Sequence, residues 1–146
     1  MSDETPAPDL RARSSYAFFS EESLRISDLD MNAHVNNIAF IQLLENARNQ
    51  FITQCTPLKR GTAMTFMLVR FEIDFVSQLF WPGKVDGACR VAELRRSSLS
   101  FGQALFDGDR CAATARATIV NVDRGTGRSA PFTDEARAVL AALAAG

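Results

Sequence analysis

The sequence of 146 residues contains one His, one Trp, one Tyr and three Cys. It also has no long uninterrupted hydrophobic run, whereas a membrane-spanning helix needs about 20 consecutive apolar residues. The 16 Lys and Arg residues nearly balance the 17 Asp and Glu residues, so the net charge is only -1. Such a charge gives no electrostatic basis for binding DNA or RNA. The composition therefore predicts neither a membrane segment nor a nucleic-acid partner.

The three cysteines, Cys55, Cys89 and Cys111, are far apart in the sequence and have apolar neighbours. An odd number of such thiols does not fit a disulfide framework, and a zinc site needs more closely spaced Cys and His ligands. The N-terminus is acidic and contains proline, unlike a secretory signal. We therefore expect a cytoplasmic protein without a metal site. Residues 1–15 are predicted to form a flexible N-terminal tail, and residues 16–146 a single domain with its own core.

One segment, residues 37–55, has the periodicity of an α-helix. Asn36 is placed to cap its start, and Pro57 follows its end. The apolar stripe extends over most of the helix circumference, through Ile38, Phe40, Ile41, Leu43, Leu44, Phe51 and Ile52. A helix that is apolar on so many sides is not a surface helix, so other elements should wrap around it.

The rest of the chain is predicted to be mainly β-structure. The expected strands are residues 16–26, 65–75, 84–96, 99–106 and 110–123, and Thr133 can cap a final helix over residues 134–146. One strand, a long apolar helix and four successive antiparallel strands indicate an α+β domain. The simplest arrangement is a curved antiparallel sheet around the long helix, because only a concave sheet covers so much of its girth.

The stretch SDLDMNAHVNN, which precedes the predicted long helix, contains a candidate site. If Asn36 caps the helix, the first free backbone N–H groups, near Asn37 and Ile38, point toward the loop with Asp30 and His34. Such donors can stabilise the oxyanion that forms on a carbonyl under attack, by about 3 to 4 kcal/mol per donor. The Asp30 carboxylate could attack that carbonyl or remove a proton from water. These two elements are sufficient for acyl transfer.

The same stretch also permits a structural interpretation, because polar residues before a helix commonly serve as caps and turns. Asp28 is better explained as an acceptor for loop N–H groups than as a catalytic residue. His34, as a lone histidine, could be a hydrogen-bonded structural residue. Three methionines are expected to fill the core, namely Met31, Met64 and Met67.

The segment DLDMNAHVNNIAFIQLLENAR resembles the signature of hot-dog-fold thioesterases, which include the 4-hydroxybenzoyl-CoA thioesterases (4HBT-like proteins) and the plant acyl-carrier-protein thioesterases. Three later segments, LVRFEIDFVSQLFWPGKV, RRSSLSFGQALF and ATIVNVDRGTGRSAPF, are similar to strands and turns of this family. The resemblance covers roughly residues 20–132. It implies the hot-dog fold, with a curved antiparallel sheet around a long central helix and a short C-terminal helix. It also implies homodimers or dimers of dimers, with active sites at the subunit interface.

The resemblance assigns roles by position. Asp30 matches the carboxylate that acts as nucleophile or general base, and Asn37 matches the residue whose backbone N–H polarises the thioester carbonyl. With Asn32 and His34, Asp30 also completes the Asp-x-Asn-x-His pattern of the plant-like enzymes, in which Asn and His orient substrate or water. Those enzymes have a further acidic residue on the following strand, where this chain has Val76, Ser77 or Gln78.

The resemblance thus implies an acyl-CoA thioesterase that releases a free acid and coenzyme A. Coenzyme A enters only as part of the substrate, and no other cofactor is expected. Asn32 and Asn36 are candidate substrate contacts, and Arg95, Arg96 and Ser98 are candidates for the pantetheine arm and its phosphates. Three alternatives remain: an acyl-carrier-protein thioesterase, a hydratase or dehydratase on the same fold, and a non-catalytic acyl-CoA-binding module. The hydratase is less favoured because no hydratase-like His and Gly pattern is identifiable near His34.

Overall fold

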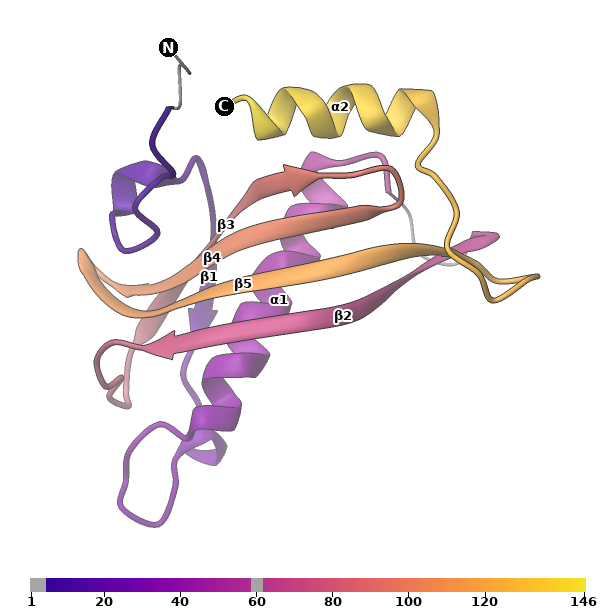
Figure 1. Cartoon of the computed structure of the whole chain (residues 1–146). Helices are drawn as coiled ribbons and strands as arrows, with labels where there is room; N and C mark the ends of the chain where they lie inside the picture. Colours follow the sequence, from indigo (N-terminus) through magenta and orange to yellow (C-terminus); the bar gives the residue numbers. More distant parts are fainter. Residues whose placement is uncertain (1–4, 59–61) are drawn as a thin grey trace.

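The computed structural model describes residues 5–58 and 62–146. Five strands form one antiparallel sheet in the order β1-β3-β4-β5-β2, and α1 crosses one face of it (Figure 1). This arrangement confirms the predicted α+β fold. The elements are, in chain order, the 3-10 turn η1 (Arg13–Ser15), β1 (Phe18–Ser23), the 3-10 turn η2 (Ile26–Asp28), α1 (Asn37–Cys55), β2 (Met64–Phe75), β3 (Lys84–Leu94), β4 (Ser98–Asp107), β5 (Arg110–Asp123) and α2 (Asp134–Ala144).

Helix α1 has the predicted bounds, because its start is fixed by a local cap. The Asn36 side chain accepts a hydrogen bond from the Ile38 N–H at 2.9 Å. The helix buries only one side against the sheet, through Ala39, Phe40, Leu44, Ala47, Arg48, Phe51 and Ile52. On the other side Ile38 and Ile41 are 63% and 40% exposed. The expectation that the helix would be wrapped on most of its circumference is therefore not met within one chain.

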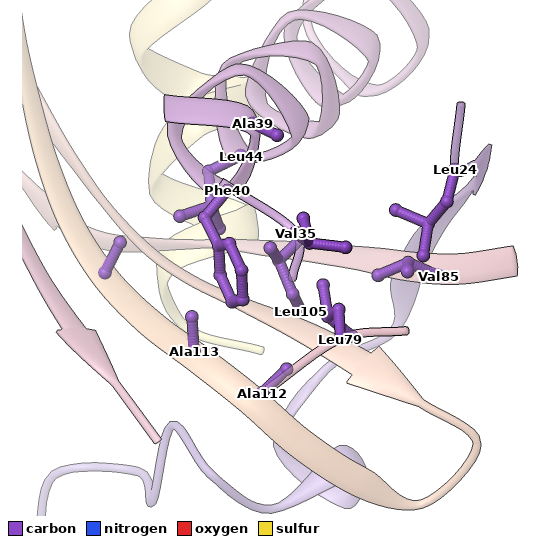
Figure 2. Close-up of a cluster of buried hydrophobic side chains, with 11 residues drawn as sticks. Leu24, Val35, Ala39, Phe40, Leu44, Leu79, Val85, Leu105, Ala112 and Ala113 are labelled. Atoms are coloured by element: carbon purple, nitrogen blue, oxygen red, sulfur yellow. The ribbon is translucent and has the colours of Figure 1, made fainter. Parts of the chain in front are cut away.

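Two apolar clusters join α1 to the inner face of the sheet. Figure 2 shows the first, in which Phe40 and Leu44 of α1 lie over Ala113 and Leu105, with Val35 of the preceding loop in the same cluster. The second surrounds the end of α1. It includes Phe51 and Ile52 of α1, Leu99 and Phe101 of β4, and Ala136 and Leu140 of α2. The first cluster anchors the start of α1, and with it the loop that carries Asp30.

A glycine allows α1 to lie close to the sheet. A Cβ atom built on Gly87 of β3 would be 2.6 Å from the Cβ atom of Ala47, closer than real Cβ contacts allow. The small residues at both positions therefore set the distance between helix and sheet. Because the helix is rigid, this contact also helps to fix its N-terminal end.

The outer face of the sheet is covered in part by the N-terminal segment. Leu10 lies against Gly102, and the Tyr16 hydroxyl donates a hydrogen bond to the Leu10 carbonyl at 2.8 Å. The Arg13 guanidinium binds Asp86 at 2.6 Å. These residues lie in or beside the segment that the sequence assigns to a flexible tail. Their contacts show where that segment lies on the fold, and its flexibility stays a prediction.

Strand β2 lies at one edge of the sheet and pairs only with β5. Three consecutive apolar residues of this edge are about half exposed, Met67, Leu68 and Val69. The prediction that Met67 fills the core is wrong, because an edge strand leaves part of its side chains without a neighbouring element. An exposed apolar edge of this kind is a surface that proteins commonly cover.

Candidate active site

The loop before α1 is closed at its base by backbone pairing. Leu29 and Val35 form an antiparallel bridge, and the Asp30 N–H donates to the His34 carbonyl at 2.8 Å. Val35 is buried and Leu29 is half-buried, so these two apolar residues face the core. Met31 lies at the tip of the loop and is fully exposed. The prediction that Met31 fills the core is therefore wrong.

Asp28 holds the start of this loop. Its side chain is 6% exposed, and its carboxylate accepts hydrogen bonds from the Arg25 backbone N–H at 2.8 Å and the Arg25 guanidinium at 3.1 Å. The Asp28 carbonyl in turn accepts the Asn36 N–H at 2.8 Å. These bonds confirm the structural interpretation of Asp28 and tie the loop directly to the residue that caps α1.

Asp30 is exposed and uses one carboxylate oxygen to order the loop. Its Oδ1 atom accepts the backbone N–H groups of Asn32 at 2.8 Å and His34 at 3.1 Å. No residue in the described part of the chain donates a hydrogen bond to Oδ2. One oxygen of Asp30 is therefore engaged in the turn, and the other is free to meet a ligand or water.

The side chains of Asn32 and His34 have a different environment from their backbones. Both residues are exposed, and their backbone N–H groups are the ones bound to Asp30. Within residues 5–58 and 62–146, nothing forms a hydrogen bond with the His34 imidazole. The imidazole is thus not among the groups that hold this loop together, contrary to the interpretation of His34 as a hydrogen-bonded structural residue.

The first turn of α1 leaves one backbone donor unpaired. The Ile38 N–H donates to the Asn36 side chain, and the Ala39 and Phe40 N–H groups donate to the Asn36 carbonyl at 2.9 and 3.3 Å. Among the described residues, the Asn37 N–H has no acceptor. The sequence placed the free donors near both Asn37 and Ile38, and the cap removes Ile38 from that pair. The remaining donor lies at the positive end of the helix dipole.

The other predicted substrate contacts lie elsewhere in the chain. Strand β3 begins at Lys84, which pairs with Ser23, a residue shortly before the Asp30 loop. The strand ends at Leu94, just before the β3–β4 turn. Eleven strand residues span about 33 Å, so the β3–β4 turn is at the far end of the sheet (Figure 1). That turn carries Arg95 and Arg96, and Ser98 is the first residue of β4. One chain therefore does not bring these three residues to Asp30.

Helix α1 contains a buried cation that the sequence pattern did not predict. Arg48 is only 5% exposed, and its guanidinium donates to the Gln103 side-chain oxygen at 3.1 Å. The Gln103 amide donates to the Leu44 carbonyl at 2.8 Å. The available signal was the position of Arg48 in the helical stripe, one turn after Leu44. A charged residue within the apolar stripe of a helix is unusual, and such a residue is a candidate for a functional role.

Among the described residues, no group of three or more His, Cys, Asp or Glu side chains is placed to hold a metal ion. No helix there is long and apolar enough to cross a membrane.

Comparison with known proteins decides the family. Residues 24–141 match the model of the thioesterase-like superfamily. The chain belongs to this superfamily. Its structure is similar to that of the PA5185 protein from Pseudomonas aeruginosa strain PAO1, with 31% identity over 90% of this chain and 94% of the other, and a TM-score of 0.82. The hot-dog resemblance inferred from the sequence is thereby confirmed.

Two further relatives extend the comparison. A thioesterase from Thermus thermophilus, whose structure is a complex with coenzyme A and Zn, is 27% identical over 86% of this chain and 98% of the other, with a TM-score of 0.75. The uncharacterized protein YsmA from Bacillus subtilis (strain 168) is 23% identical over 131 residues, which are 88% of both chains. The thioesterase relatives support a thioester hydrolase in general terms.

Proposed function

We propose that this member of the thioesterase-like superfamily is an acyl-CoA thioesterase, which hydrolyses an acyl-CoA to a free acid and coenzyme A. The proposal depends mainly on one observation: among the described residues, the Asn37 backbone N–H has no acceptor, and it directly follows a loop in which one carboxylate oxygen of Asp30 has no donor. An oxyanion donor and a carboxylate are the two groups that acyl transfer requires. The Thermus thermophilus relative that binds coenzyme A supports the choice of thioester.

In the proposed reaction, the thioester oxygen accepts the Asn37 N–H, which polarises the carbonyl. Asp30 then acts through its Oδ2 atom in one of two ways. As a nucleophile it forms an acyl anhydride, which water hydrolyses; as a general base it takes a proton from the attacking water. In both routes the carbon–sulfur bond breaks and the coenzyme A sulfur leaves and takes up a proton. His34 and Asn32 are assigned to orienting water or substrate.

We further propose that a second copy of the chain completes the site. Asp30, His34 and Ile38 are exposed in one chain, yet an acyl group needs apolar walls. The exposed side of α1 and the apolar edge of β2 supply a surface suited to self-association. A homodimer, or a dimer of dimers, would also allow Arg95 and Arg96 of one copy to approach Asp30 of the other, which one chain cannot do.

The proposal is tested with a panel of acyl-CoAs that differ in chain length and include benzoyl-CoA. Release of free thiol is followed with a chromogenic thiol reagent, and binding is measured separately by calorimetry. We expect turnover of at least part of the panel. Binding without thiol release would instead identify a non-catalytic acyl-CoA-binding module. Loss of enoyl-CoA absorbance without thiol release would identify a hydratase, and preference for the same acyl group on an acyl carrier protein would move the assignment to that substrate.

The two routes for Asp30 are separated by a single turnover in water labelled with ¹⁸O. Covalent attack places label in the Asp30 carboxylate after hydrolysis of the anhydride at the enzyme carbonyl carbon. Water can attack the Asp30 carbonyl carbon of the anhydride in only a fraction of turnovers. In that case, repeated turnover before analysis increases the amount of label in the Asp30 carboxylate. Label found only in the released acid over many turnovers favours water activation by a general base.

A further inference from the structure

A cavity of about 260 Å³ lies between the second half of α1 and the beginning of β2. Arg48 and Asn49 line it from the helix, and Phe66, Leu68 and Ile119 form apolar walls from β2 and β5. We call this cavity the Arg48 pocket. The loop with Asp30 does not line it, and Arg48 is about 16 Å further along α1 than Asn37, at about 1.5 Å per residue. It is therefore separate from the Asp30 loop of the same chain, although Leu68 also belongs to the β2 edge that we propose for self-association.

The charge of Arg48 is not compensated within the described structure. Its guanidinium has five N–H donors, and among the described residues only the Gln103 side-chain oxygen accepts from it. No described carboxylate lies within ion-pair distance of Arg48. Glu45 lines the same cavity and is the acidic group whose charge acts on Arg48, but it forms no salt bridge with it. Burial lowers the pKa of Arg48.

A buried cation without a counter-charge is unfavourable, and buried charges in proteins are normally paired, so a bound anion would stabilise this one. The orientation of this one is fixed, because Gln103 holds the guanidinium and is itself held by the Leu44 carbonyl at 2.8 Å. The Phe71 ring centroid lies 6.0 Å from the guanidinium carbon. The remaining N–H groups are thus presented in a defined direction instead of being free to turn toward water.

The lining indicates which kind of anion would bind. A planar guanidinium matches a carboxylate through two parallel hydrogen bonds. The apolar walls suit a hydrocarbon stem, which inorganic phosphate lacks. Two cations, Arg48 and Arg124, and one carboxylate, Glu45, line the cavity, so the lining carries one net positive charge and suits a singly charged anion. We propose that the Arg48 pocket binds the carboxylate of a short organic acid, with Arg48 as its charged anchor. The inference requires no thioester hydrolysis, so it stands or fails separately from the proposed function.

The test measures binding of hexanoate by calorimetry and by ligand-observed NMR, with hexanamide as the neutral analogue of the same shape. We expect saturable binding of hexanoate at millimolar concentration, and binding of hexanamide that is weaker by about tenfold or more, as for loss of a charge-assisted hydrogen bond. Arg48→Met should weaken hexanoate binding by a similar factor. Arg48→Lys keeps the charge without the planar fork and should bind hexanoate with intermediate affinity.

Two control variants locate the binding. Arg128→Met removes an exposed cation outside the pocket and should leave hexanoate affinity unchanged. Asp74→Asn, which changes an exposed residue of β2 that does not line the pocket, should also leave it unchanged. Equal affinity for hexanoate and hexanamide would overturn the proposal, as would no binding of hexanoate to the wild type. Wild-type affinity for hexanoate in folded Arg48→Lys and Arg48→Met would also overturn it. If Arg48→Met instead changes the oligomeric state and the wild type does not bind hexanoate, the counter-ion is a carboxylate of a second copy and the proposal is wrong.

Discussion

Replacing Asp30 with Asn separates the two roles that its carboxylate oxygens have. The Oδ1 atom of Asp30 accepts the backbone N–H groups of Asn32 and His34, and an Asn side chain keeps an acceptor at that position. The Oδ2 atom has no donor among the described residues, and in Asp30→Asn it becomes an NH₂ group. An amide can neither attack a thioester nor take a proton from water at neutral pH. The variant should therefore keep the loop and lose the chemistry.

The expected magnitudes differ enough to be measured separately. A positioned general base contributes about 10²- to 10⁴-fold in rate, which corresponds to about 3 to 5.5 kcal/mol in transition-state stabilisation. The loop loses only the charge assistance of two exposed hydrogen bonds, so the free energy of unfolding should fall by less than about 1 kcal/mol. Asp30→Ala removes the acceptor of both bonds and should cost about 2 kcal/mol, at about 1 kcal/mol for each bond.

The assay compares kcat and KM for thiol release with the free energy of unfolding in urea. Asp74→Asn is the matched control, because it makes the same change in charge at an exposed residue of β2. It should have wild-type kcat. The reasoning is refuted if Asp30→Asn folds normally and turns over within about threefold of the wild type, a difference far below that of a lost general base.

Four other changes test separate parts of the structure. His34→Ala should lower kcat by about 10- to 100-fold, at the low end for acid–base residues, and an unchanged kcat would remove His34 from the reaction. Asn36→Ala deletes the cap of α1 and should cost about 1 kcal/mol in urea unfolding, with a rise in KM if the helix start frays. Gly87→Ala should cost about 1 to 3 kcal/mol, because its Cβ would lie 2.6 Å from that of Ala47; a neutral effect would show that α1 can shift away. Burial raises the pKa of the Cys89 thiol well above its ordinary value. At alkaline pH this thiol therefore stays protonated in the folded chain and ionises in the unfolded chain. The free energy of unfolding should therefore fall above about pH 9, by up to about 1.4 kcal/mol per pH unit, and Cys89→Ala should flatten that fall.

Features that depend on neighbouring residues in the sequence could be predicted well. The bounds of α1 follow from a cap and an apolar stripe, and both are local patterns. The alternation of Phe71, Ile73 and Phe75 with charged residues predicts β2. Phe71 and Ile73 are half-buried as expected, whereas Phe75 at the end of the strand is 47% exposed. The structural role of Asp28 and the cap at Asn36 are also local, since each binds a backbone group within a few residues. Such patterns do not need the tertiary structure to be known.

Features set by tertiary packing could not be predicted in this way. Arg48 occupies a stripe position that normally carries an apolar residue, and only the fold shows that Gln103, 55 positions later in the sequence, holds it there. Met67 has the composition of a core residue, but its exposure follows from the order of the strands, which places β2 at an edge. Membership in a sheet can be inferred from periodicity. The position of a strand within that sheet depends on long-range pairing.

The incomplete wrapping of α1 and the exposure of the candidate site have the same physical origin. The apolar stripe of α1 is wider than the surface that five strands cover, so Ile38 and Ile41 remain exposed beside the start of the helix. The free Asn37 N–H and the Asp30 loop lie at this same end, where water would compete for both groups in a single chain. Excluding that water strengthens an oxyanion contact, because electrostatic interactions are stronger in a dry site. The excess apolar surface of α1 is thus best explained, within our proposal, as surface for a second copy that also closes the site over the thioester.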